Sequence, residues 1–244
     1  SSGNLNADTL SGKTAAVYND SGNISLKSGT FDDLHLENDY GDVRLDGTAV
    51  KNASDLTLDS GHITVADSTL GAARIYNESG NITLNKTNGT SMEVTAEYGD
   101  VSFTDTEISD VGTFTLDSGN FSANTSTVKA ITVKNDSGNV LLNQFSSESA
   151  VFTLSYGDLD LTATKLGSFD CKSENGNVSI QLPDPFDSYG FNLHTEYGEI
   201  ALPSAKETAL IAEEDDSSEV SYRTNSEAKH KIQVECENGN IRIG

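Results

Sequence analysis

The stretch Asp20-Ser21-Gly22-Asn23-Ile24-Ser25-Leu26 recurs nineteen residues later as Asp39-Tyr40-Gly41-Asp42-Val43-Arg44-Leu45. The same turn, a glycine between Ser, Tyr or Asn and a short polar residue, continues at a spacing of 19 to 22 residues through the 244-residue chain. Its glycines are Gly3, Gly22, Gly41, Gly61, Gly80, Gly99, Gly119, Gly138, Gly157, Gly176, Gly198 and Gly239, with Ser218 filling one degenerate position. A period that spans the chain is typical of a repeat protein, so we expect one domain over residues 1–244.

Apolar residues occupy the second and fourth positions after each glycine, with a polar residue between them, as in Ile63-Thr64-Val65. This alternation predicts a strand with one buried face. Further apolar columns lie five residues before the glycine and, less regularly, nine after it, which indicates three short strands per turn. We therefore expect an all-β, right-handed parallel β-helix (β-solenoid) of 12–13 rungs, roughly 58 Å long. A two-sheet sandwich is the rival fold, but its strands would not keep a constant period.

The composition narrows the possible partners. With 38 acidic and 15 basic residues the formal charge is −23, which disfavours binding to nucleic acid and to anionic lipid. No apolar run is long enough for a membrane span, and the chain opens directly in repeat sequence. We expect an export signal or a membrane anchor to precede this chain in the full-length protein.

The units around Gly22, Gly41 and Gly99 resemble a bacterial family described as adhesins. That family is a domain-of-unknown-function group of β-strand repeats, common in Gram-positive bacteria, which includes LiaG-like envelope-stress accessory proteins. The resemblance covers essentially the whole chain. It implies an exported solenoid at the cell surface or tethered to the membrane, and it supplies no catalytic residues.

An acidic column stands two residues before most of the glycines. If the rungs are in register, neighbouring carboxylates lie about 5 Å apart and repel each other. Two interpretations remain open: each acid accepts hydrogen bonds from its own turn, or the column weakly binds Ca²⁺ or Mg²⁺. No other cofactor is expected. The candidate ligands are Asp20, Asp39, Asp59, Glu78, Glu97, Asp117 and Asp136.

The turn residues are also correlated with each other. A tyrosine before the glycine goes with an acid after it, whereas Ser or Asn before it goes with Asn or His. Two corner conformations would explain the pairing, and a ligand-binding stripe is the alternative. The tyrosine rungs are three, three and two apart, so they make no continuous aromatic surface, which weakens the stripe. The tyrosines are Tyr40, Tyr98, Tyr156 and Tyr197.

Two cysteines, Cys171 and Cys236, fall in the repeat three rungs apart. That register separates them by about 14 Å along the axis, which is too far for a disulfide. We predict two reduced thiols that face inward and pack as small apolar residues.

Three classes of function are compatible with these features. We expect a non-enzymatic cell-surface module, an adhesin or envelope-stress scaffold that binds a protein or cell-wall polymer along one face. A polysaccharide-binding or polysaccharide-degrading β-helix and a purely structural spacer are the alternatives. Open rung edges at the ends favour end-to-end self-association. The segment around Pro183, Asp184, Pro185 and Phe186, where one unit lengthens to 22 residues, and the acidic run 213–219 predict a partner surface.

Overall fold

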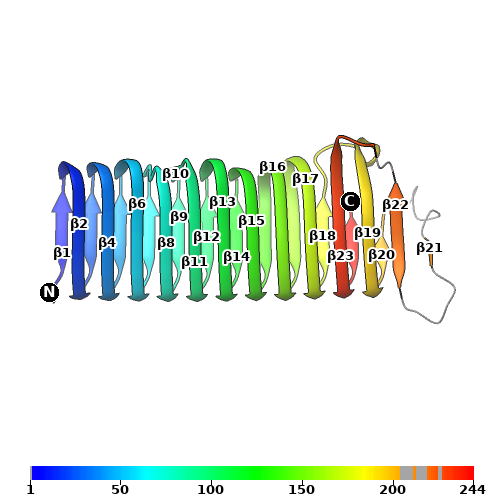
Figure 1. Ribbon diagram of the computed structural model, residues 1–244, viewed down its shortest axis with the longest axis horizontal. Coiled ribbons are helices and arrows are strands. Elements are labelled where there is room, and N and C mark those ends of the chain that lie inside the picture. The colour runs from blue at the N-terminus through cyan, green and yellow to red at the C-terminus, as the bar shows by residue number, and fades with distance from the viewer. Residues whose placement is uncertain (1, 204–210, 213–218, 225–226) are drawn as a thin grey trace.

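The computed structural model describes residues 2–203, 211–212, 219–224 and 227–244. These residues form a rod of stacked strands with the N-terminus at one end (Figure 1). Neighbouring turns pair in parallel, with a period of about nineteen residues. The structure confirms the predicted parallel β-solenoid.

Each turn of the rod contains a short and a long strand. The short ones are β1 (Leu5–Asp8), β3 (Ile24–Lys27), β5 (Val43–Asp46), β7 (Ile63–Ala66), β9 (Ile82–Asn85), β12 (Val101–Thr104), β14 (Phe121–Asn124) and β18 (Val178–Gln181). The two-residue strand β10 (Asn88–Gly89) pairs instead with the start of a long strand, β13. The long ones are β2 (Ser11–Ser21), β4 (Thr30–Tyr40), β6 (Ala49–Ser60), β8 (Ala72–Ser79), β11 (Ser91–Tyr98), β13 (Glu107–Ser118), β15 (Thr127–Ser137), β16 (Val140–Tyr156) and β17 (Leu159–Asn175).

The expected three strands per turn are therefore wrong in detail. The apolar residue nine positions after one glycine and the apolar residue five positions before the next glycine lie in the same long strand. A local irregularity in strand pairing separates them, as between Ile108 and Val111. A second corner lies six residues after the glycine, where Ser28, Lys86 and Thr125 adopt left-handed φ values of 48° to 53°. In β16 and β17 the chain runs as one 17-residue strand.

The core is a column of side chains along the axis of the rod. Ile63 pairs with Ile82, and Ile82 with Val101, each with no exposed surface. The alternating apolar residues of the short strands thus stack on their equivalents, as the repeat predicts. Phe103, Phe114 and Phe121 fill the middle of the rod, with ring centroids 5.0 to 5.5 Å apart.

The corner glycines are held by two sets of close contacts. A Cβ atom on Gly80 would lie 2.0 Å from the carbonyl oxygen of Gly61, so a side chain does not fit between the rungs. The polar residue after each glycine accepts a hydrogen bond from the backbone N–H of its equivalent in the next rung; Asn23, for example, accepts from Asp42 at 2.9 Å. This ladder explains why Asn, Asp and His share the position, since each offers an acceptor atom on a short side chain.

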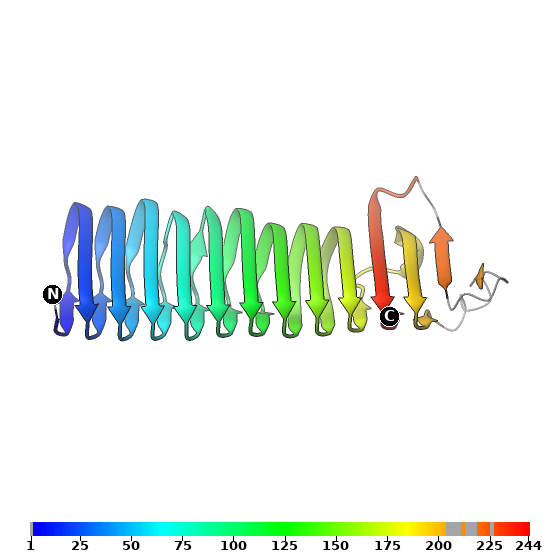
Figure 2. The same ribbon diagram turned by 60° about the horizontal axis from the view of Figure 1, so that its bottom comes forward.

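The C-terminal end departs from chain order. After β18, a short 3₁₀ helix (Phe186–Ser188) leads to β19 (Tyr189–Tyr197) and β20 (Ile200–Ala201). These strands do not pair with β17 and β18. The last strands of the chain, β23 (His230–Asn238) and β24 (Ile241–Ile243), lie between the two levels and pair in parallel with both. Figure 2 shows the red β23 between β17 and the gold β19.

This arrangement corrects the expected succession of 12–13 rungs. Only about nine turns, those of β2 to β17, follow one another in chain order. The 22-residue unit at Pro183 is long because its extra residues carry the chain past the level that β23 and β24 occupy. We call β23 and β24 the inserted rung.

Antiparallel strands close this end of the rod. Strand β22 (Val220–Thr224) pairs antiparallel with β19, and β21 (Ile211–Ala212) pairs antiparallel with β22. We call β19, β20 and β22 the cap. The degenerate position at Ser218 and the acidic run 213–219, apart from Glu219, lie outside the described residues.

Candidate functional site

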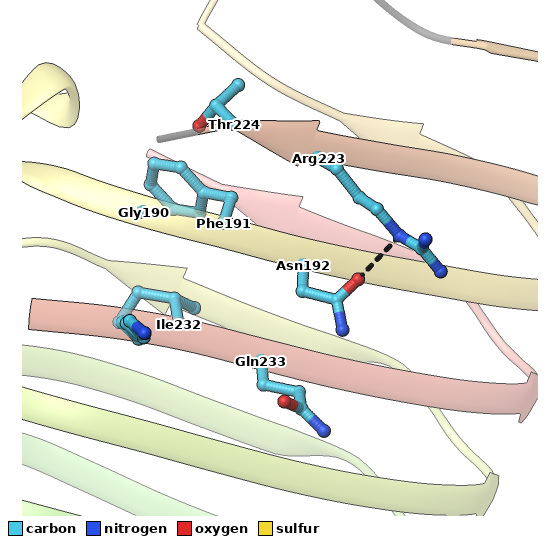
Figure 3. Close-up of a pocket in the computed structure, with 8 residues that line it drawn as sticks. Gly190, Phe191, Asn192, Arg223, Thr224, Ile232 and Gln233 are labelled. Carbon is cyan, nitrogen blue, oxygen red and sulfur yellow. Dashed lines mark hydrogen bonds between the residues drawn. The ribbon is translucent and has the colours of Figure 1, made fainter. Parts of the chain in front are cut away.

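A hollow of about 600 Å³ lies on the outer face of the cap and the inserted rung. We call it the C-terminal groove. Strands β19, β22 and β23 bring together residues distant in sequence, and Figure 3 shows Arg223 and Asn192 pointing toward one another. The lining residues are Gly190, Phe191, Asn192, Arg223, Thr224, Lys231, Ile232 and Gln233.

Two basic side chains line this groove. The Nε atom of Arg223 donates a 2.9 Å hydrogen bond to Oδ1 of Asn192, its cross-strand neighbour. Lys231 comes from the inserted rung, where it pairs in register with Gly190. In the described part of the chain neither Arg223 nor Lys231 forms an ion pair, whereas Arg74, Lys165 and Lys172 each lie within 3.4 Å of a carboxylate oxygen.

The predicted partner segment lies beside the groove and is largely structural. The ring of Phe186 stacks on Phe191 at 4.1 Å and is partly buried against the core. Asp184 accepts a 3.3 Å hydrogen bond from the hydroxyl of buried Tyr189. Burial, followed by the charge and hydrogen bond of Asp184, raises the pKa of Tyr189 to about 12. Pro183 and Pro185 lie in the segment that spans the inserted rung, and Pro185 precedes the 3₁₀ helix.

The acidic column forms a ridge that follows the rungs. Some of its members have partners of their own: Glu97 accepts a 2.7 Å hydrogen bond from Tyr76, and Asp136 lies 3.4 Å from the ammonium group of Lys134. The hydrogen bond to Glu97 is the largest cause that raises the pKa of Tyr76 to about 12. No group of three His, Cys, Asp or Glu residues within the described ranges is placed to hold a metal ion. Weak Ca²⁺ or Mg²⁺ binding along the ridge stays a prediction.

The four corner tyrosines are exposed, and their spacing differs from the expectation. Tyr40 neighbours Ser60, Tyr98 lies between Ser79 and Ser118, and Tyr156 pairs with Asn175. Asn175 pairs with Asn238 of the inserted rung, and Asn238 with Tyr197. The inserted rung therefore adds one level, and the tyrosines occur at every third rung throughout, not three, three and two apart.

The φ angles of the corner glycines Gly41, Gly99 and Gly157 do not support the explanation by two corner conformations. The glycine φ angles of tyrosine rungs, from 118° at Gly41 to 150° at Gly99, overlap those of the other rungs, from 112° at Gly22 to 150° at Gly176. One backbone corner thus serves both kinds of turn. Its geometry does not explain why tyrosine and an acid occur together.

The expected distance between the cysteines is also wrong. Because β23 pairs with β17, Cys171 lies opposite Val234, and Cys236 lies opposite Ser173 on the adjacent rung. Both thiols are free and buried, as predicted. Burial is the main cause that raises the pKa of Cys236 to about 12 and the pKa of Cys171 well above its usual value.

The groove is the feature that reasoning from the sequence missed. Arg223 and Lys231 are only eight residues apart, but chain order gave them no reason to share a surface with Asn192. An available signal was Gly190, a glycine outside the corner register. No helix in the described ranges has the length and apolar character needed to cross a membrane.

A comparison with family models gives one match, over residues 1–70 and 63–244. No curated protein matches this chain, and no solved structure matches it either. The two matched ranges together cover the whole rod, including the inserted rung and the cap. The chain belongs to the family described as Toastrack DUF4097, a domain of unknown function.

Proposed function

We propose that this chain is a non-enzymatic module of the cell surface or envelope, an adhesin or scaffold rod that binds its partner through the C-terminal groove. The observation that carries the proposal is the pair of basic residues, Arg223 and Lys231, in one hollow of a chain with a formal charge of −23. The partner is a protein or cell-wall polymer that presents phosphate or carboxylate groups.

The chemistry of the groove suits an anionic group. The hydrogen bond from Nε of Arg223 to Asn192 orients the guanidinium, whose terminal nitrogens can then bind two oxygens of one phosphate or carboxylate. Lys231 adds a second positive charge to the lining. The acidic remainder of the rod repels anions, which restricts their binding to this end.

The same lining supports binding over catalysis. Hydrolysis or elimination on a polysaccharide uses a general acid or base, in most cases a carboxylate, within reach of the substrate. The described residues that line the groove include no Asp, Glu, His or Cys. The groove can therefore hold an anion, while Lys231 is the one described lining side chain that could exchange a proton and has no acid–base partner among the others.

Co-sedimentation with isolated bacterial cell envelopes tests the proposal. We expect R223E/K231E to weaken envelope binding about tenfold or more, since two attractive charges become repulsive. The matched control is K13E/K27E, which changes the net charge equally but at exposed positions near the opposite end of the rod. Equal binding by both variants would show that the groove is not the binding site. Competition with polyphosphate and with polygalacturonate distinguishes phosphate from carboxylate partners.

A further inference from the structure

The four corner tyrosines, Tyr40, Tyr98, Tyr156 and Tyr197, form an evenly spaced row along one edge of the rod. Between successive tyrosines lie two rungs with Ser or Asn at the same position. Three rungs at about 4.8 Å each give a repeat of about 14 Å. The final interval is regular only because the inserted rung lies between Tyr156 and Tyr197.

Each ring of the row is open to solvent. The exposed fractions of the four tyrosines are 61% to 65%, values that are high for a large aromatic side chain. The neighbours in the adjacent rungs are small and polar, such as Ser21 and Ser60 on either side of Tyr40. The flat faces of the rings are therefore available for stacking at regular intervals.

A negative charge accompanies every ring of the row. The residue after the glycine is acidic in the four tyrosine rungs, and it is Asn or His in the other eight. The ladder of hydrogen bonds between rungs does not require this charge, because Asn81 and His62 accept the next backbone N–H as Asp100 does. The four acids are Asp42, Asp100, Asp158 and Glu199, all exposed.

An exposed aromatic ring and an exposed carboxylate that flank the same corner glycine are together suited to a positively charged group. The ring attracts a cation through its π electrons, and the carboxylate attracts it through its charge. Asp100 keeps its Oδ2 atom for such a group, since the backbone and side chain of Asn120 both donate their hydrogen bonds to Oδ1. Asp158 makes the same pair of bonds through Oδ1 to Asn177.

The backbone of the row is already occupied. The carbonyl oxygens of the four tyrosines accept hydrogen bonds of 2.8 to 3.1 Å from corner glycines of the neighbouring rungs. An extended peptide that binds by adding a strand needs free main-chain groups at a sheet edge, and the row offers none of these carbonyls. Recognition here has to use side chains, which favours a ligand whose rings can stack on the tyrosines and which carries its own charges.

We propose that the tyrosine row binds a linear polysaccharide with free amino groups. The sugar rings stack on the tyrosine faces, and the ammonium groups pair with the adjacent carboxylates. One chain of the polymer engages several rungs at once, so weak individual sites add up to useful affinity. The inference goes beyond the proposed function, because it names a class of partner for a second surface that is separate from the groove and opposite to it in charge.

Calorimetric titration with glucosamine oligomers tests the row, at physiological ionic strength and at a pH where the amines are protonated. We expect the change of all four tyrosines to serine, the residue of neighbouring rungs, to weaken binding about tenfold or more, with the net charge unchanged. The matched control is Tyr18→Ser, since Tyr18 is 60% exposed but lies outside the row. Oligomers too short to reach from one tyrosine to the next should bind much more weakly than longer ones.

A second variant and its control test the role of the carboxylates that accompany the tyrosines. D42N/D100N/D158N/E199Q keeps an acceptor at each position and should weaken binding as much as the serine variant does, whereas acidic-ridge changes in rungs without tyrosine, such as D59N and D117N, should not. Unchanged binding by the serine variant would overturn the proposal, because the affinity would then come only from the general attraction between an acidic protein and a cationic polymer. If N-acetylated oligomers bound with the same affinity, the ammonium groups would have no role in binding. If polylysine bound in a tyrosine-dependent way and the glucosamine oligomers did not, the partner would be a cationic peptide and not a polysaccharide. Because R223E/K231E leaves the row intact, failure of the groove and failure of the row give different results.

Discussion

The turns up to β18 and the turns at the C-terminal end are built from the same repeat, but they are assembled differently. In the first region each rung lies on the rung that precedes it in the chain; in the second, the last rung of the chain lies between two earlier ones. The parallel pairing, the corner glycines and the inward columns are nevertheless alike in both. Any rung can therefore pack on another rung of the same shape, and the connecting segments determine which rungs become neighbours.

The energetic basis of this comparison is the locality of the stack. In a solenoid each rung contacts only its two neighbours, so stability is close to a sum of rungs and interfaces. The inserted rung supplies two of these interfaces, one to β17 and one to β19. It holds the cap to the rest of the rod.

Removal of residues 230–244 should have the largest effect. Strand β19 would lose its parallel partner, and we expect the amides of β19 and β22 to lose nearly all protection from hydrogen exchange. The turns up to β16 should keep theirs, because their interfaces are unchanged. Hydrogen exchange with mass spectrometry measures both regions in one sample. Persistent protection of β19 would mean that it pairs with β17 directly and that the insertion is dispensable.

Alanine at corner glycines compares the packing of the two regions. A Cβ atom would lie 1.9 Å from the carbonyl oxygen of Gly176 in Gly239→Ala, and 2.0 Å from that of Gly119 in Gly138→Ala. We expect each change to cost about 3 kcal/mol, because rigid backbone has to move.

The control for these changes is Gly47→Ala. Its φ is positive, 60°, as is that of Gly138, but its nearest heavy atom is 3.8 Å away, so we expect a cost of only about 1 kcal/mol. Denaturant unfolding followed by circular dichroism measures all three. A mild effect confined to Gly239→Ala would show that the inserted rung packs more loosely than the regular stack.

The buried thiols make the C-terminal region sensitive to alkaline pH. Below about 8.5, the pKa of an unfolded cysteine, both states keep the proton and stability is unaffected. Above it the unfolded chain ionises while folded Cys236 keeps its proton up to about 12, so stability falls as the pH rises through this window. We expect a loss of about 1–2 kcal/mol per thiol at pH 10.

Cys236→Ala should flatten this pH dependence, and Thr64→Ala, a change outside the C-terminal region, should not. Unfolding measured from pH 7 to 10 gives the comparison. A Cys236→Ala chain whose stability falls as steeply as that of the parent would assign the loss to other groups, such as Tyr76 and Tyr189, whose pKa values are also raised to about 12.

The period of the sequence was sufficient to predict the fold, since Ile63, Ile82 and Val101 had to stack if equivalent residues lie nineteen apart. It could not predict the order of the last rungs. The repeat makes all rungs alike, so Val234 fits β17 as well as Leu193 would, and only the lengthened unit at Pro183 indicated that the chain skips a level. The cysteine distance was wrong for the same reason.

The candidate sites depended on that order even more strongly. The groove needs β23 beside β19, so Arg223 and Lys231 could not be placed together from the sequence. The tyrosines could be identified individually, but their regular interval exists only with the inserted rung counted between Tyr156 and Tyr197. The three-dimensional order thus restored a pattern that chain order had obscured.

The smallest expected effect on stability concerns the second corner of each turn, six residues after the glycine. In the regular stack this residue is left-handed, and Thr125 has a φ of 50° there, although it is β-branched. At the equivalent position of the last sequential turn, Ala163 is buried within continuous strand β17. Glycine should therefore act in opposite directions: Thr125→Gly should stabilise by about 1 kcal/mol through relief of the left-handed strain, and Ala163→Gly should destabilise by about as much. The hydroxyl of Thr125 donates an exposed 3.3 Å hydrogen bond to Gln144, whose loss costs little. Thermal unfolding of the two variants measures the difference. If both changes shifted the stability in the same direction, the second corner would be under no strain in the regular stack. Chain order would then be the main distinction between the two regions.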